Sequence, residues 1–171
     1  MADTAQSERL QPSLLDRLTD NEPAKKEESR AQRVLSMKKL REGVVRDLLW
    51  LLNTTKLDVT QEISKYPEVA KSVVNFGVPD LVGVTASSVD ARDLEQQIRE
   101  AIWNYEPRLK RNSVHVRAAV ADGRQAQNTL VFEIEGELWA EPMPIRLFLK
   151  TQLDLEDGSV TTVDGTQSES R

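Results

Sequence analysis

The sequence predicts an α+β domain in which helices pack on one face of an antiparallel four-stranded meander. Apolar residues recur every three or four positions before residue 106 and at every second position from residue 114 onward. The helical segments come first and the strands follow one another without interruption, an order typical of α+β domains. A chain of 171 residues has the length of one such domain with tails.

The first long helix is expected from Arg33 to Asn53, because its apolar residues step by three or four positions and form one stripe. The members of this stripe are Val34, Met37, Leu40, Val44, Leu48 and Leu51. A short helix should begin at Pro67, which suits a first helical turn, run through Val74 and stop at Gly77.

The second long helix is expected to begin near Ser88 or Asp90 and to end before Pro107. Its apolar face consists of Leu94, Ile98, Ala101, Ile102 and Tyr105. Neither long helix sustains three or four apolar heptads, so the sequence does not predict a coiled coil.

Four strands are expected after Leu109. The inward residues of the first three strands are Val114, Val116, Ala118 and Val120, then Leu130, Phe132, Ile134 and Leu138, then Ile145, Leu147, Leu149 and Leu153. Turns are expected at Asp122-Gly123 and Asp157-Gly158, and the fourth strand runs from Val160 to Val163.

The second strand carries a row of carboxylates on its outward face. If the hairpin between the second and third strands is symmetrical, Glu137 faces Arg146 and Glu133 faces Lys150. Alternate residues of a solvated strand point the same way by geometry, so the row predicts cross-strand ion pairs rather than a metal site.

The two ends of the chain differ from its middle in composition. Residues 1–30 carry five basic and seven acidic groups with few large apolar residues, and are expected to be mostly disordered apart from one short amphipathic helix. Residues 31–163 are expected to form the globular domain, and residues 164–171 a disordered acidic tail.

Composition excludes several classes of protein. The chain has no cysteine, which excludes disulfides and thiolate zinc sites and fits a reducing cytoplasm. Residues 31–151 carry 17 basic and 16 acidic groups, so no basic face for nucleic acid is expected. No apolar run approaches the roughly 20 residues that span a bilayer, and no export signal is visible. We expect a cytoplasmic protein without direct membrane insertion.

Sequence motifs of the common enzyme classes are missing. There is no phosphate loop, dinucleotide-binding glycine fingerprint or nucleophile elbow in the sequence. The single histidine, His115, falls on the polar side of its strand without a second histidine or cysteine to complete a metal site. We therefore expect no catalytic residues, no metal and no cofactor.

A leucine cluster interrupts the polar N-terminal segment. Leu14, Leu15 and Leu18 would share one face of a helix of about two turns. A helix this short is marginal in isolation, so it must pack against something else. It could pack against this protein's own domain or into a groove on a partner, and we expect it to dock into the partner's groove.

The segment Glu106-Pro107-Arg108 lies at the junction between the second long helix and the expected sheet. Its local explanation is that proline stops the helix while Glu106 and Arg108 are solvated or paired with each other. Alternatively, the planar fork of Arg108 and the two acceptors of Glu106 contact a partner. The residue pattern alone leaves both explanations open.

Five segments occur in an order that points to a known family. They are Asn75-Phe76-Gly77-Val78-Pro79-Asp80-Leu81, Ile98-Arg99 with Ala101-Ile102, Glu106-Pro107-Arg108-Leu109, Gly136-Glu137-Leu138-Trp139-Ala140, and Leu153-Asp154-Leu155 with Gly158. In this order they resemble the TssE family of type VI secretion baseplate subunits, which is similar to a wedge component of contractile phage tail baseplates and is often labelled lysozyme-like. The resemblance runs from about Leu35 to Val163 and includes the leucine cluster, and the Glu-Pro-Arg signature is intact.

The resemblance implies a cytoplasmic structural protein in a contractile injection machine. Such a subunit joins the TssF and TssG wedge subunits and presents a platform on which the TssB and TssC sheath begins to polymerise. The partner-binding residues are then expected to be Glu106, Pro107 and Arg108 together with Leu14, Leu15 and Leu18. On this account, substitution of Glu106 or Arg108 leaves folding intact and abolishes assembly, whereas an internal pair would instead stabilise the free domain.

The lysozyme-like label suggests an alternative function, a peptidoglycan-cleaving glycosidase. Glu106 would be its general acid and Asp80 or Glu133 its second carboxylate. A nearby arginine favours an ionised carboxylate, the opposite of what a catalytic acid needs. The eight aromatic residues of the chain also leave little to line a sugar-binding cleft. The structural role is therefore the preferred hypothesis.

Overall fold

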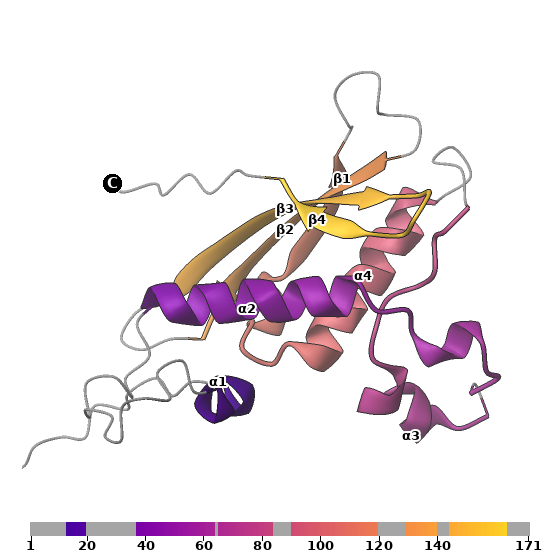
Figure 1. Cartoon of the computed structure of the whole chain (residues 1–171), viewed down its shortest axis with the longest axis horizontal. Helices are drawn as coiled ribbons and strands as arrows, with labels where there is room; N and C mark the ends of the chain where they lie inside the picture. Colours follow the sequence, from indigo (N-terminus) through magenta and orange to yellow (C-terminus); the bar gives the residue numbers. More distant parts are fainter. Residues whose placement is uncertain are drawn as a thin grey trace, which may run out of the picture.

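The computed structural model describes residues 13–19, 37–63, 65–83, 90–119, 129–139 and 144–163. Its elements are α1 (Leu14–Leu18), α2 (Met37–Leu52), η1 (Leu57–Val59), α3 (Pro67–Ala70), η2 (Val73–Asn75), α4 (Ala91–Tyr105), η4 (Arg111–Ser113), β1 (His115–Ala119), β2 (Thr129–Leu138), β3 (Ile145–Asp154) and β4 (Val160–Thr162). The strands form one antiparallel sheet in the order β1-β2-β3-β4, with α2 and α4 against one face (Figure 1). The predicted α+β fold is confirmed.

Some sequence predictions fall on residues outside those described. They are the order of residues 1–12, 20–30 and 164–171, the first residues of the helix expected from Arg33, the helix start at Ser88 and the turn at Asp122-Gly123. The division of the chain into a domain with two disordered ends therefore stays a prediction.

The core is formed between α2, α4 and the inner face of the sheet. On α2, the predicted stripe buries Leu40, Val44, Leu48 and Leu51. These side chains join one cluster with residues of α4 and with the inward residues of β2 and β3. Each fully buried aliphatic side chain contributes about 1.5–3 kcal/mol, so this stripe is a main source of stability.

Helix α4 has the boundaries that its sequence predicts. Asp90 is the N-cap, and its carboxylate accepts hydrogen bonds from the backbone N–H groups of Arg92 and Asp93. The helix ends at Tyr105, two residues before Pro107, which cannot continue the helical hydrogen bonding. Glu106, the residue at the C-cap, is thereby placed at the corner between helix and sheet.

The predicted register of the second hairpin is confirmed. Glu133 lies opposite Lys150 and Glu137 lies opposite Arg146. The carboxylate of Glu133 is 3.6 Å from Lys150 Nζ, whereas Glu137 reaches Lys110 Nζ at 3.3 Å. Glu133 therefore makes the predicted cross-strand ion pair with Lys150. The predicted pair of Glu137 with Arg146 is wrong, because the Glu137 carboxylate pairs with Lys110 instead.

A lobe made of η1, α3 and η2 projects beside α2 and α4 (Figure 1). The short helix expected from Pro67 onward is confirmed only as far as Ala70, because the Ser72 hydroxyl accepts from the Val74 N–H and starts a separate 3-10 turn. Two side chains fix the lobe. Asn75 accepts from the Asp58 N–H and donates to the Ala70 carbonyl, and the Tyr105 hydroxyl donates to the Ser72 and Asn75 carbonyls.

Candidate functional site

The candidate site begins with Glu106 and Arg108 at the end of α4. Glu106 is only 4 % exposed. Arg108 Nε donates to Glu106 Oε1 at 2.6 Å, and Arg108 Nη2 donates to Glu106 Oε2. This bidentate pairing uses the planar fork of the guanidinium and fixes its orientation.

Three further charged residues extend this pair into a network that we call the corner network: Asp16, Arg46, Asp47, Glu106 and Arg108. Arg108 Nη2 also donates to Asp47 Oδ2 at 2.6 Å, and Arg46 Nε donates to Asp47 Oδ1 at 2.9 Å. Arg46 Nη1 then donates to Asp16 Oδ1. The corner network therefore joins α1, the middle of α2 and the end of α4 through alternating charges.

Electrostatics favour the charged forms of Arg108 and Asp16. Burial lowers the pKa of Arg108, but hydrogen bonds and charges from Glu106 and Asp47 more than offset it, so the pKa lies above its ordinary value. Hydrogen bonds from Arg46 and then Ser13 hold the pKa of Asp16 below its ordinary value of 3.8. Both shifts favour the charged form that makes the ion pairs.

Helix α1 is attached to the domain through its polar side. Ser13 caps the helix by accepting from the Asp16 N–H, and Asp16 reaches across to Arg46. The apolar side is left open, since Leu14 is 70 % and Leu18 is 74 % exposed. Of the two alternatives for the leucine cluster, the structure thus shows contact with the protein's own domain, but mainly through polar groups.

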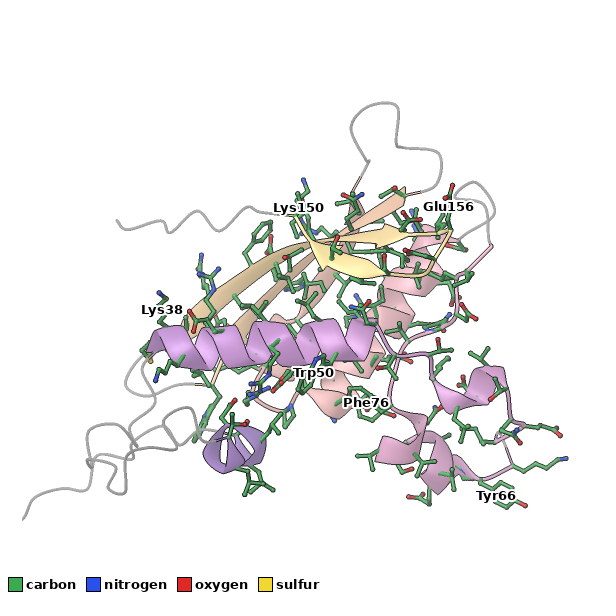
Figure 2. The ribbon with its side chains drawn as sticks, in the orientation of Figure 1. Lys38, Trp50, Tyr66, Phe76, Lys150 and Glu156 are labelled. Atoms are coloured by element: carbon green, nitrogen blue, oxygen red, sulfur yellow. The ribbon has the colours of Figure 1, made fainter. Side chains whose placement is uncertain are left out.

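A groove of about 470 Å³ lies between α1, α2 and the segment where α4 ends. Its lining includes Leu15 of α1, Trp50 of α2, Phe76 beside the lobe and Pro107. Trp50 projects below α2 and Phe76 lies between α2 and the lobe (Figure 2). The charged residues that line the groove, Asp47, Glu106 and Arg108, are already paired within the corner network, so the groove offers a mainly apolar surface.

The structure brings the predicted partner-binding residues into one region. Leu15, Glu106, Pro107 and Arg108 all line this groove, and Leu14 and Leu18 are exposed on the helix at its edge. The pair Glu106 and Arg108 is bonded within the chain, which supports the internal explanation of the pair that the sequence left open. Whether these residues also bind a partner stays a prediction.

Sequence reasoning did not identify the rest of the corner network. Asp16 and Arg46 are 30 positions apart in the sequence, and Asp47 and Arg108 are 61 positions apart. Residue spacing therefore gives no indication of these contacts. One signal was present. Arg46 and Asp47 interrupt the otherwise apolar run from Val44 to Leu52, and charges inside a buried stripe require partners.

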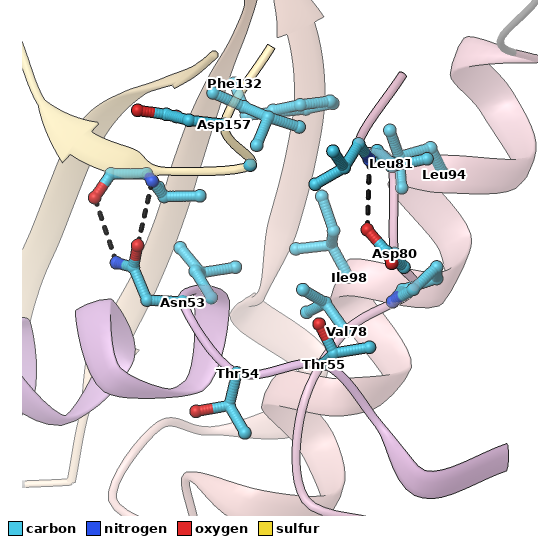
Figure 3. A pocket seen from close by; sticks show the side chains of 16 residues that line it. Asn53, Thr54, Thr55, Val78, Asp80, Leu81, Leu94, Ile98, Phe132 and Asp157 are labelled. Atoms are coloured by element: carbon cyan, nitrogen blue, oxygen red, sulfur yellow. Dashed lines mark hydrogen bonds between the residues drawn. The ribbon is translucent and has the colours of Figure 1, made fainter. Parts of the chain in front are cut away.

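A second cavity, of about 150 Å³, lies where α2 ends beside β4 (Figure 3). Leu94, Ile98 and Phe132 line its apolar part, with Asn53 and Asp80 among its polar residues. The Asn53 side chain accepts from the Val160 N–H and donates to the Val160 carbonyl, each at 2.9 Å, so it clamps α2 to β4. This cavity is therefore a packing feature of the α2 and β4 junction.

The carboxylates considered for a glycosidase are not gathered around one cavity. Glu106 lines the groove, Asp80 lines the cavity at β4, and Glu133 lies on the outward side of β2 paired with Lys150. Asp80 is exposed and accepts a hydrogen bond from the Val82 N–H in its own turn. The structure thus gives Glu106 an arginine partner rather than a second carboxylate.

Within the described ranges, no group of three or more His, Cys, Asp or Glu side chains is arranged to hold a metal ion. Among the helices of those same ranges, none has the length and apolarity to cross a bilayer.

Fold and site together define a small α+β scaffold with a fixed ionic corner beside an open apolar surface. Comparison with known families matches residues 38–143 to baseplate wedge protein gp25. This match covers more than half of the chain, and the chain belongs to this family of structural proteins, which associate with other baseplate subunits. TssE subunits belong to the same family, so the resemblance seen in the sequence is confirmed. Comparisons with curated proteins and with solved structures gave no significant match.

The Asp16 and Arg46 contact predicts a pH dependence for α1. Because the pKa of Asp16 is lowered in the folded protein, the contact stabilises α1 fully above about pH 4 and is lost as the pH falls through the lowered pKa. Exchange of the Thr19 amide, bonded to the Leu15 carbonyl, reports on the helix. Protection in the wild type should exceed that in Asp16→Asn by a constant factor from pH 5 to 7. This difference should begin to shrink below about pH 4 and should vanish only once the pH is below the lowered pKa of Asp16. A difference that persists unchanged in acid would contradict the assignment.

Proposed function

We propose that this protein is a TssE-type baseplate subunit of a type VI secretion system. In this role it joins the TssF and TssG wedge subunits in the cytoplasm, at the inner face of the cell envelope, and presents the platform on which the TssB and TssC sheath begins to polymerise. Membership of the baseplate wedge family supports the structural part of this proposal. The contacts with TssF, TssG and the sheath are proposed in addition to that membership.

The observation that carries the proposal is the orientation of α1. A free-standing domain gains stability by burying leucines, yet α1 is held by Asp16 and leaves Leu14 and Leu18 in solvent. The corner network thus fixes a helix with its apolar side outward, beside an apolar groove. Such an arrangement is suited to capture an amphipathic helix of a wedge subunit.

The Glu-Pro-Arg segment contributes to the same surface. Pro107 is exposed at the groove, while Glu106 and Arg108 fix the backbone on either side of it and hold Asp47 in place. In this proposal Leu14, Leu15, Leu18 and Pro107 touch the partner. Glu106 and Arg108 set the shape of the surface, and the edge of Arg108 that remains accessible adds a polar contact.

Leucine replacement on α1 separates partner binding from folding. The double variant Leu14→Ser with Leu18→Ser should weaken binding to TssF and TssG about 10- to 100-fold, because it removes two apolar anchors. The melting temperature of the free protein should change by less than about 2 °C, since both side chains are exposed. Val73→Ser, which alters an equally exposed apolar residue on the lobe, is the matched control and should bind normally.

A large fall in melting temperature would instead place the leucines in this protein's own core. Normal binding by a folded double variant would remove α1 from the partner surface. Deletion of residues 1–22 should reproduce the double variant.

The experiment that tests the function follows sheath assembly in cells. The gene for this chain is deleted in the bacterium that encodes it, and sheaths are imaged with fluorescent TssB. The proposal expects sheaths to be lost and to return when the wild-type chain is supplied. It further expects that the purified protein does not clear a peptidoglycan suspension, and that Glu106→Gln leaves this baseline unchanged. Sheath formation at normal frequency without the chain, or clearing that depends on Glu106, would reject the proposal.

A further inference from the structure

A tryptophan beside the Glu-Pro-Arg segment is left in solvent. Trp139, which follows the last residue of β2, is 60 % exposed. Of the three tryptophans of the chain, Trp103 packs against the core, whereas Trp50 is 52 % exposed and lines the groove. Tryptophan carries a large apolar area and is usually well buried.

The backbone of Trp139 is joined to the Glu-Pro-Arg segment. Its N–H donates to the Arg108 carbonyl at 2.8 Å. The next residues of the two segments, Leu109 and Leu138, form an antiparallel bridge, and both side chains are buried. Because successive side chains of an extended chain point to opposite sides, Trp139 points away from the core side that Leu138 faces. The exposure of the indole therefore follows from its place next to Leu138.

The corner network connects the two exposed tryptophans. The guanidinium of Arg46 lies 5.1 Å from the centre of the Trp50 ring, a cation–π contact. Arg46 is bonded to Asp47, Asp47 to Arg108, and the backbone of Arg108 to Trp139. Apolar residues that are exposed singly are common on protein surfaces, but Trp139 is attached to a residue that lines the groove and so extends an apolar surface.

We propose that Trp139 is a second aromatic anchor for the wedge subunit that occupies the groove. The inference rests on the proposed function for the identity of this partner, and on the structure for the position of the anchor. A helix that packs on Trp50 and Pro107 can extend to Trp139, because Arg108 both lines the groove and is bonded to Trp139. Tryptophan is among the residues that most often dominate the binding energy of protein interfaces.

The charges next to Trp139 indicate the kind of side chain that it would meet. Glu137, two positions earlier on β2, forms an ion pair with Lys110 at 3.3 Å. The guanidinium of Arg108 is bonded within the corner network. These charges are paired inside the chain, and the centres of protein interfaces are poor in charged residues. The indole therefore fits an apolar side chain of the partner, such as leucine, methionine or phenylalanine.

Substitutions of Trp139 test the anchor in binding titrations of the full-length chain with TssF and TssG. Trp139→Ala should weaken binding about 10- to 100-fold, because it removes the whole ring. Trp139→Phe keeps a flat apolar ring and should stay within about threefold of the wild type. Tyr66→Ala removes an equally exposed ring from the lobe, so it is the matched control and should bind normally. The melting temperature of each free variant should change by less than about 2 °C.

Hydroxyl-radical oxidation shows directly whether the indole is covered. Trp139 should be oxidised readily in the free chain and at least about fivefold more slowly in the complex with TssF and TssG, whereas oxidation of Tyr66 should not change. Protection in the free chain that disappears after deletion of residues 1–22 would show that this protein's own N-terminal segment covers the ring. Protection in the free chain that disappears on dilution would assign the contact to a second copy. Either result would overturn the inference.

Failure of the inference and failure of the proposed function give different results. Normal binding by Trp139→Ala, or unchanged oxidation of Trp139 in the complex, overturns the inference and leaves the proposed function intact. A large fall in the melting temperature of Trp139→Ala, or equally weak binding by Trp139→Phe, also overturns it. A wild-type chain that binds neither TssF nor TssG rejects the proposed function, and the inference with it.

Discussion

Replacing Glu106 with alanine is expected to lower the free energy of unfolding by about 3–5 kcal/mol and to abolish baseplate assembly. Glu106 is nearly fully buried, and its carboxylate satisfies two donor groups of Arg108. Without it, Arg108 keeps Asp47 as its one ionic partner among the described residues, while remaining largely shielded from water. Denaturant unfolding of the purified variant measures the loss directly.

Two further variants make this test specific. Glu42→Ala removes an exposed carboxylate that lies 3.9 Å from Lys38, and should cost less than about 1 kcal/mol. Arg108→Lys keeps the charge but loses the planar fork, so it should be destabilised as well. A Glu106→Ala protein as stable as the wild type but unable to assemble would show that Glu106 acts by direct partner contact. That result would contradict the structural role of the corner network.

Replacing Gly77 with alanine is expected to destabilise the protein by at least about 3 kcal/mol. Gly77 has φ +136°, a region that residues with a Cβ rarely adopt. A Cβ at this position would lie 2.3 Å from the Thr54 carbonyl oxygen and 2.8 Å from the Lys56 nitrogen. The backbone there is held by two hydrogen bonds, Val78 N–H to the Thr54 carbonyl and Lys56 N–H to the Val78 carbonyl. Relief of the clash therefore requires those bonds to break.

Gly83→Ala is the matched control for backbone conformation. Gly83 also has a positive φ of 75°, but no atom of the described residues lies within 4 Å of its added Cβ. It should cost only about 1 kcal/mol, the conformational part of the effect. Comparing the thermal unfolding of the two variants separates the cost of the positive φ from the cost of the steric clash with the Thr54 carbonyl. Equal costs at the two positions would contradict the close approach at Thr54.

The secondary structure of this protein could largely be predicted from its sequence because it depends on local signals. The stripe on α2, the Asp90 cap, Pro107 and the alternation along β2 and β3 each specify one element. The helix expected from Pro67 is shorter in the structure because the Ser72 hydroxyl caps a new turn, a side-chain contact that periodicity does not reveal.

The candidate site could be predicted only in part. Glu106 and Arg108 were found because they are neighbours in the sequence, and the leucines because they share a helical face. Their connection through Asp16, Arg46 and Asp47 depends on tertiary contacts between elements far apart in the chain. The outward orientation of the leucines likewise depends on which side of α1 is held by Arg46. Neither property has a signature in residue spacing.

The central claim is that this protein is a structural joint between wedge subunits, and copurification tests it most directly. The tagged full-length chain is coexpressed with TssF and TssG from the same bacterium, with the Leu14→Ser and Leu18→Ser double variant in parallel. The account predicts a stable complex for the wild type, and a complex that is lost or weakened at least about tenfold for the folded variant. Failure of the wild-type chain to bind either wedge subunit would contradict it.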